Sequence, residues 1–192
     1  PLLKPIKKHK IIDKEEYTHL ETQIYIEQIK QTPIQREPLE ACWSHIPSAL
    51  QTHPDIVTCY TQQLSAINLN DIAATLIVKA LKHNWNDVLV SLYCRLPSET
   101  HEHFALAEKW IEKHPDNPYL LQGVARLAIR QKFWGKAKHY LESAINLSED
   151  QTSYQLLGYV LDAMGDKAGA LDAYRTGLSV TENLTLAHTV HS

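Results

Sequence analysis

Glycine is missing from the first 122 residues, and all six glycines of the 192-residue chain lie between Gly123 and Gly177. A loop that cradles a phosphate needs several glycines, because backbone N–H groups must approach the anion closely. Neither a GxGxxG nor a GxxxxGK[ST] string occurs in the sequence. The sequence therefore excludes nucleotide-binding enzymes of these two types.

Cysteine is also scarce, and its pattern bears on the cellular compartment. Cys42, Cys59 and Cys94 show no CxxC spacing, and three is an odd number. A disulfide scaffold or a zinc site needs denser and paired cysteines. We expect reduced thiols, no metal site and a cytoplasmic protein. Apolar runs are short as well, so no segment reaches the ~20 residues of a membrane-spanning helix.

Charge is unevenly distributed along the chain. The formal net charge is -3, yet residues 1–14 hold five lysines and one aspartate, which leaves -7 for the remainder. An acidic body argues against nucleic-acid binding driven by phosphate neutralisation. The basic arm either lies near an anionic membrane surface or is a solvated tail. Because the chain begins at Pro1 with neither Met nor an apolar leader, we expect the natural N-terminus to lie upstream.

The hydrophobic pattern predicts helices throughout. Asp13 and Glu16 form a capping box for a helix over residues 14–31, and Pro38 lies in the first turn of a second helix that Pro47 ends. From Pro54 onward, helix pairs are separated by short polar turns, at residues 83–86, 97–100, 114–118, 131–133, 148–150 and 164–167. No stretch shows the sustained period-two alternation of a strand. The sequence thus predicts an all-α protein without a β-sheet.

The last third of the chain repeats itself every 33 residues. Ala137 and Ala170 are one period apart, as are Leu141 and Tyr174. The later unit contains Leu157-Gly158, then Ala170, Tyr174 and Gly177, and resembles the tetratricopeptide repeat (TPR), a helical hairpin with small residues at fixed positions. The resemblance implies a right-handed α-solenoid of about four hairpins over residues 54–183, capped by irregular helices within residues 1–53 and followed by a frayed tail at 184–192.

The small residues of the repeat have a packing role. Gly158 on the first helix and Ala170 on the second let the two backbones approach, while Tyr154, Leu157 and Tyr174 fill the surrounding space. We therefore expect Ala137 and Ala170 to be buried.

A second resemblance depends on residues outside the repeat consensus: Phe133-Trp134-Gly135-Lys136-Ala137-Lys138, Trp43 before Ile46-Pro47, and Tyr174-Arg175. Over residues 36–180 the chain resembles the cytoplasmic part of the HemY family, although Tyr93-Cys94 departs from that family's pattern. The resemblance implies an N-terminal anchor in the bacterial inner membrane, a TPR domain on its cytoplasmic face, and an association with late protoheme biosynthesis. The implied partners are haem-biosynthesis enzymes.

No catalytic arrangement is recognisable. The sequence has no GxSxG elbow and no HExxH pair, and Asp162 and Asp166 flank Gly165 as turn residues do. We expect a non-catalytic scaffold without a cofactor. The alternative is a direct haem or porphyrin carrier that uses a groove histidine such as His83 or His139.

A repeat array offers a concave face lined by the first helix of each hairpin. Thr58, Gln62 and Asp162 occupy such positions, and the predicted partner-binding groove comprises Arg95, Tyr119, Gln122, Arg126, Arg130, Gln155 and Tyr159. Arginine and tyrosine suit an acidic or amphipathic protein segment. Alternatively, Arg126 and Arg130 only keep their helix solvated.

Overall fold

A computed structural model describes the backbone of residues 13–97 and 101–189, and side chains as far as Val180. All regular structure in these ranges is α-helical, with no strand, which confirms the predicted fold class. The helices form two compact units, residues 1–96 and 97–192, which are described separately below. None of the helices described is long and apolar enough to span a lipid bilayer.

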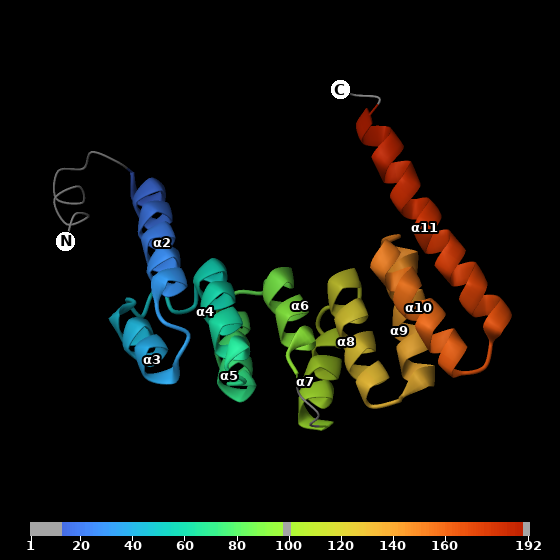
Figure 1. Ribbon diagram of the computed structural model, residues 1–192, viewed down its shortest axis with the longest axis horizontal. Coiled ribbons are helices and arrows are strands. Elements are labelled where there is room, and N and C mark those ends of the chain that lie inside the picture. Colours follow the sequence, from blue (N-terminus) through green and yellow to red (C-terminus); the bar gives the residue numbers. More distant parts are fainter. Residues whose placement is uncertain (1–12, 98–100, 190–192) are drawn as a thin grey trace. The chain divides into compact units, whose positions relative to one another are not determined.

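The described part of the first unit contains five helices (Figure 1): α2 (Lys14–Gln31), α3 (Arg36–His45), α4 (Pro54–Ala66), α5 (Asn70–His83) and α6 (Asp87–Arg95). Helix α2 has the predicted bounds, and the Asp13 side chain accepts the Glu16 N–H at 2.8 Å. The four basic residues Lys4, Lys7, Lys8 and Lys10 of the arm lie outside the described residues.

The core of the first unit lies between α4 and its neighbours. Ile56, Leu64 and Ile77 are fully buried where α4 packs against α5. The rings of Trp43 on α3 and Tyr60 on α4 stack at 4.2 Å. Burial, assisted by the Glu40 charge, raises the pKa of Tyr60 to about 12. The aromatic pair thus helps to hold α3 against α4.

The second unit contains α7 (His101–Ile111), α8 (Pro118–Arg130), α9 (Trp134–Leu147), α10 (Gln151–Ala163) and α11 (Lys167–Thr189). Two successive hairpins, α8–α9 and α10–α11, correspond to the two 33-residue repeats. Helix α7 packs against α8. In Figure 1 these two hairpins follow one another from yellow to red.

The small residues of the repeat are buried as predicted. Ala137 is 0% and Ala170 is 3% exposed. A Cβ added at Gly158 would lie 2.5 Å from the Tyr174 ring, and one at Gly177 would lie 2.9 Å from Tyr154 Cβ. Both glycines therefore permit the close approach of α10 and α11 that the repeat pattern implied.

Three hairpin turns share one geometry. Asn68 and Lys132 have φ values of 61° and 59°, and Gly165 has a φ of 88°. The next residue in each turn donates its N–H to the carbonyl five positions back, with distances of 2.9 Å in all three turns: Leu69 to Leu64, Phe133 to Ala128, and Asp166 to Leu161. This is the Schellman motif, in which a left-handed residue ends the first helix. Lys132 and Gly165 are one repeat apart.

Side-chain caps define the starts of several helices. Asn86, Asn117 and Asp150 each accept a backbone N–H from the first turn of α6, α8 and α10, respectively. Asp150 also accepts a hydrogen bond from the Ser153 hydroxyl at 2.8 Å. These contacts satisfy N–H groups that have no partner inside a helix.

A polar cluster joins α7 to α9 within the second unit. The Glu108 carboxylate accepts hydrogen bonds from Lys136 Nζ and from the Tyr140 hydroxyl, both at 2.6 Å. Burial raises the pKa of Glu108, but the two hydrogen bonds and the Lys136 charge outweigh it, so that the pKa lies below its usual value. The Tyr140 pKa is raised by burial and by the same carboxylate. The cluster orients the face of α7 that packs against the next hairpin.

Two expected boundaries look different in the structure. The helix pair expected between the turns at residues 83–86 and 114–118 contributes α6 to the first unit and α7 to the second, and a continuous array over 54–183 stays a prediction. Helix α11 extends to Thr189, so the segment expected to be a tail from residue 184 is helical over most of its length. Residues 190–192 lie outside the described part of the chain.

Candidate partner-binding surface

The predicted groove residues fall into both units. Arg95 belongs to the first unit and the other six residues to the second. Each set is therefore a separate candidate surface: the α4–α6 depression in the first unit, and the α8–α10 surface in the second.

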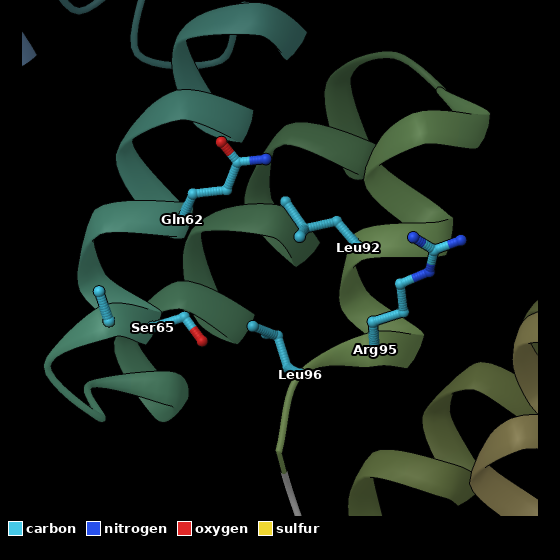
Figure 2. A pocket seen from close by; sticks show the side chains of 6 residues that line it. Gln62, Ser65, Leu92, Arg95 and Leu96 are labelled. Carbon is cyan, nitrogen blue, oxygen red and sulfur yellow. The ribbon is translucent and has the colours of Figure 1, made fainter. Parts of the chain in front are cut away.

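The α4–α6 depression is an open hollow of about 340 Å³ within the first unit. Its lining residues lie on α4, on α6 or at the C-cap of α6: Gln62, Ser65, Ala66, Leu92, Arg95 and Leu96. Figure 2 shows Gln62 on α4 across from Leu92 and Arg95 on α6. The structure thus brings together Gln62 and Arg95, two residues that the repeat register had assigned to equivalent positions.

The chemistry of the depression is mixed. Leu92 and Leu96 supply apolar surface, while Gln62, Ser65 and Arg95 supply an amide, a hydroxyl and a guanidinium. The Ser65 hydroxyl lies 2.8 Å from Asn70 Oδ1, which fixes it to the start of α5. Thr58, also predicted to be an inner residue, is half-buried and does not line the hollow.

The α8–α10 surface consists of Tyr119, Gln122, Arg126 and Arg130 on α8, and Gln155 and Tyr159 on α10. Residues spaced by three or four positions lie on one face of a helix, so the four α8 residues share a face, as do the two on α10. Tyr119 is 59% and Tyr159 is 51% exposed. Large aromatic side chains this exposed, on the first helices of successive hairpins, are available for contact with another molecule.

Gln122 has a structural role that the sequence did not reveal. Its Nε2 donates to Asp150 Oδ2, and also to Ser153 Oγ at 2.9 Å. The side chain therefore connects α8 to the start of α10 and holds the two first helices of the surface in register. Gln122 lies on the α8–α10 surface, and its amide already has two hydrogen-bond partners within the chain.

The Tyr159 side chain packs against a second aromatic ring. Its ring meets the Trp134 ring edge to face, with centroids 6.1 Å apart. An aromatic side chain that is held by another ring loses less rotamer freedom on binding.

The remaining residues of the α8–α10 surface differ in exposure: Arg126 is half-buried, whereas Arg130 and Gln155 are exposed. Of the two arginines, Arg130 is therefore the more exposed.

The structure explains Asp162 and Asp166 as turn residues. Lys167 Nζ lies 2.5 Å from Asp162 Oδ1, and Asp166 Oδ1 accepts the Gly169 N–H at 2.9 Å. Both carboxylates therefore stabilise the connection between α10 and α11, as the turn pattern had indicated. The Asp162 carboxylate is therefore already paired with Lys167 and is not an unpaired acidic group of the groove.

His83 and His139 are the candidate haem ligands. His83 ends α5 and His139 lies on α9, so both are on second helices of hairpins and not on the helices that line either surface. Both are exposed. Within the described ranges, no group of three or more His, Cys, Asp or Glu side chains is arranged to hold a metal ion.

No known protein-family description matches the chain. No curated protein matches it either.

Solved structures do resemble the chain. One is MamA MSR-1 C2, with a TM-score of 0.55 and 12% identity, covering 85% of this chain and 95% of that one. Another is MamA from Desulfovibrio magneticus RS-1, with a TM-score of 0.54 and 13% identity over 85% and 96% of the two chains. A third is the Cut9–Hcn1 hetero-tetramer of the APC/C, with a TM-score of 0.50 and 13% identity, where the match covers 86% of this chain but 33% of that one.

These likenesses concern the fold, since the identities are low. Together with the repeat register, the buried alanines and the shared turns, they lead to one conclusion: the chain is a TPR-like helical domain.

Proposed function

We propose that this protein is a non-catalytic interaction scaffold that binds an acidic or amphipathic segment of another protein on its α8–α10 surface. The observation that supports this most directly is the exposure of Tyr119 and Tyr159 on successive first helices, beside the exposed Arg130. Tyrosine and arginine, like tryptophan, are enriched among the residues that contribute most to binding. The Cut9 structure, which is titled a hetero-tetramer with Hcn1, offers a neighbour that assembles with another protein.

The resemblance to the HemY family gives this scaffold a cellular setting. In this proposal the domain faces the cytoplasm from the bacterial inner membrane, where the anchor of the full-length protein holds it. Its partners are enzymes of late protoheme biosynthesis. The lysines of residues 1–14 would then lie close to anionic lipid headgroups.

The test of the surface uses a double variant, Tyr119→Ser with Arg130→Glu. Both positions are exposed, so the fold should persist, whereas charge reversal and loss of an aromatic anchor should weaken capture of haem-biosynthesis enzymes at least about tenfold. Arg126 is left unchanged because it is half-buried. Purified candidate enzymes are titrated against the immobilised protein.

The matched control is Lys109→Glu, which reverses an exposed charge on α7, outside the α8–α10 surface. It should leave capture unchanged. If the double variant is folded and binds as the unmodified protein does, the α8–α10 surface is not the binding site. If no late haem-biosynthesis enzyme binds the unmodified protein, the partner assignment fails while the surface remains testable with other proteins.

A haem titration separates the scaffold from a direct haem or porphyrin carrier. Saturable one-to-one binding with a shifted Soret band, abolished by His83→Ala or His139→Ala, would favour the carrier. The scaffold proposal expects weak, unsaturated binding that neither substitution changes.

A further inference from the structure

The α4–α6 depression of the first unit is a hollow to which the proposed function assigns no ligand. Its volume of about 340 Å³ lies at the low end of the ~300–1,000 Å³ of small-molecule sites. Such sites enclose most of their ligand, whereas this hollow is open to solvent. A segment of another protein, which inserts one or two side chains and leaves its backbone outside, therefore suits the hollow better than a metabolite does.

The lining residues define the chemistry of such a segment. Leu96 is buried and Leu92 half-buried, and both give the hollow apolar surface. Arg95 is exposed and is the one charged side chain of the six that line the hollow. A guanidinium binds a carboxylate through two parallel N–H···O hydrogen bonds, and its five N–H donors can serve more than one acceptor. The lining thus matches an aliphatic side chain beside a carboxylate.

Both helices contribute polar groups to the hollow. Figure 2 shows Gln62 on α4 across from Leu92 and Arg95 on α6. The Gln62 side chain is exposed, and its amide can both donate to and accept from the backbone of a bound segment. A segment whose carboxylate lies on Arg95 would therefore bridge α4 and α6.

The position of Arg95 on its helix is repeated on the α8–α10 surface. Arg95 on α6 and Arg126 on α8 each lie nine residues after the asparagine that caps the helix. Two residues after each cap lie Val88 and Tyr119, which are 60% and 59% exposed. Residues seven positions apart share a helix face. Helix α6 thus presents an apolar side chain and an arginine in the same order as α8.

We propose that the α4–α6 depression binds a segment of another protein in which an acidic residue neighbours an aliphatic one. The carboxylate lies on Arg95, and the aliphatic side chain contacts Leu92 and Leu96. This site lies on the first unit, so the inference goes beyond the proposed function and does not depend on the α8–α10 surface.

The affinity of the site is expected to be low. The hollow lies at the C-terminal ends of α4 and α6, where the partial negative charge of the last carbonyl groups opposes an anion. The direct hydrogen bonds of the guanidinium must offset this effect. We expect a dissociation constant of about 0.1–1 mM for a short peptide.

The first test titrates the full chain with a peptide and follows the methyl signals of Leu92 and Leu96 by NMR. The probe is a blocked heptapeptide in which serine alternates with two glutamate–leucine pairs. Both methyl signals should shift and saturate. A control peptide with lysine in place of glutamate, and another with serine in place of leucine, should each bind at least about tenfold more weakly.

The second test changes the protein. Arg95→Glu should weaken binding of the glutamate–leucine peptide at least about tenfold, and Arg95→Lys should weaken it less, because lysine keeps the charge but loses the two parallel hydrogen bonds. The matched control is Lys82→Glu, which reverses an exposed charge on α5, outside the lining residues. It should leave binding unchanged. Circular dichroism checks that all three variants are helical.

Binding that depends on Arg95, but not on Lys82, supports the proposal. Three results overturn it: no shift up to about 5 mM peptide, equal binding of either control peptide, or undiminished binding by a folded Arg95→Glu variant. The ring signals of Tyr119 and Tyr159 are followed in the same titrations. Shifts at these tyrosines without shifts at the two leucines would contradict this inference and leave the proposed function intact.

Discussion

Glycines of the second unit differ in what surrounds them, and the difference predicts opposite effects of the same substitution. At Gly177 an added Cβ would lie 2.9 Å from Tyr154 Cβ and 3.4 Å from the Gln151 carbonyl oxygen, whereas at Gly135 it would meet nothing within 4 Å. Gly177→Ala should therefore lower the free energy of unfolding by about 1–2 kcal/mol through overpacking. Gly135→Ala should raise it by a few tenths up to about 1 kcal/mol, because alanine favours the helix.

Urea unfolding of the two variants, followed by circular dichroism at 222 nm, measures both changes under one condition. Equal effects of the two substitutions would contradict the close packing of α10 on α11 at Gly177.

Asp150 predicts a pH dependence of stability. Burial raises the pKa of this carboxyl, but hydrogen bonds from Ser153 and Thr152 outweigh it and hold the pKa below its usual value. A depressed pKa stabilises the folded state above the unfolded pKa of about 3.9, and this contribution is lost as pH falls below it. Asp150→Asn keeps an acceptor for the cap but removes the charge, and should cost about 0.5–1 kcal/mol at pH 7.

The measurement is urea unfolding of both proteins at pH 7, 5 and 3. The stability difference should be present at pH 7 and 5 and shrink at pH 3. A difference that stays constant with pH would mean that the charge of Asp150 does not contribute.

At the scale of elements, the shared hairpin turn allows a reciprocal exchange. Lys132 and Gly165 occupy the same left-handed position one repeat apart. A side chain at positive φ costs about 1 kcal/mol that glycine avoids. We expect Lys132→Gly to raise the free energy of unfolding by about 1 kcal/mol and Gly165→Lys to lower it by about as much.

Thermal and urea melts of the two variants and of the double exchange test this equivalence. The double exchange should unfold close to the unmodified protein. A loss of stability in Lys132→Gly would indicate that the lysine side chain contributes more than its backbone strain costs.

Sequence patterns predicted the helices well because the relevant forces are local. The bounds of α2 follow from a cap at Asp13 and from Pro33, both of which act within one turn. The α8–α9 and α10–α11 turns fell where polar residues interrupt the helical period. Asn117 followed by Pro118 is a local signal of the same kind for the start of α8, although the polar pattern of residues 114–118 by itself predicts only a turn.

The candidate surface was less predictable because it depends on contacts between distant residues. Gln122 was assigned to the groove by its position on α8, yet its hydrogen bonds reach Asp150 and Ser153, about 30 residues further on. The Glu108, Lys136 and Tyr140 cluster likewise joins residues 28 to 32 positions apart. No local pattern specifies such pairs, since each depends on how neighbouring helices pack.

At the scale of the molecule, the division into two units predicts that the chain can be cut between them. The second unit, residues 97–192, has its own buried core in α8, α9 and α10, including Leu120, Val124 and Leu141. We expect the fragment 97–192 to be helical and to unfold cooperatively. Circular dichroism with a thermal melt is the measurement.

A fragment that begins at Pro118 serves as the comparison, since it lacks α7 and the contacts of Glu108 with Lys136 and Tyr140. It should melt at a lower temperature than 97–192. A fragment 97–192 with a random-coil spectrum would show that the two units depend on each other for folding.

The packing of each helix against its near neighbours in the sequence also affects the rates of folding and of local opening. Within the second unit α7 packs on α8, α8 on α9, α9 on α10 and α10 on α11, so the stabilising contacts join segments a few tens of residues apart. Proteins with such short-range contacts close small loops during folding and fold quickly. Among the described helices α11 packs mainly on α10, so the α10–α11 hairpin can open while the helices before it stay closed. Its amide protons should therefore exchange with solvent deuterium sooner than those of α8.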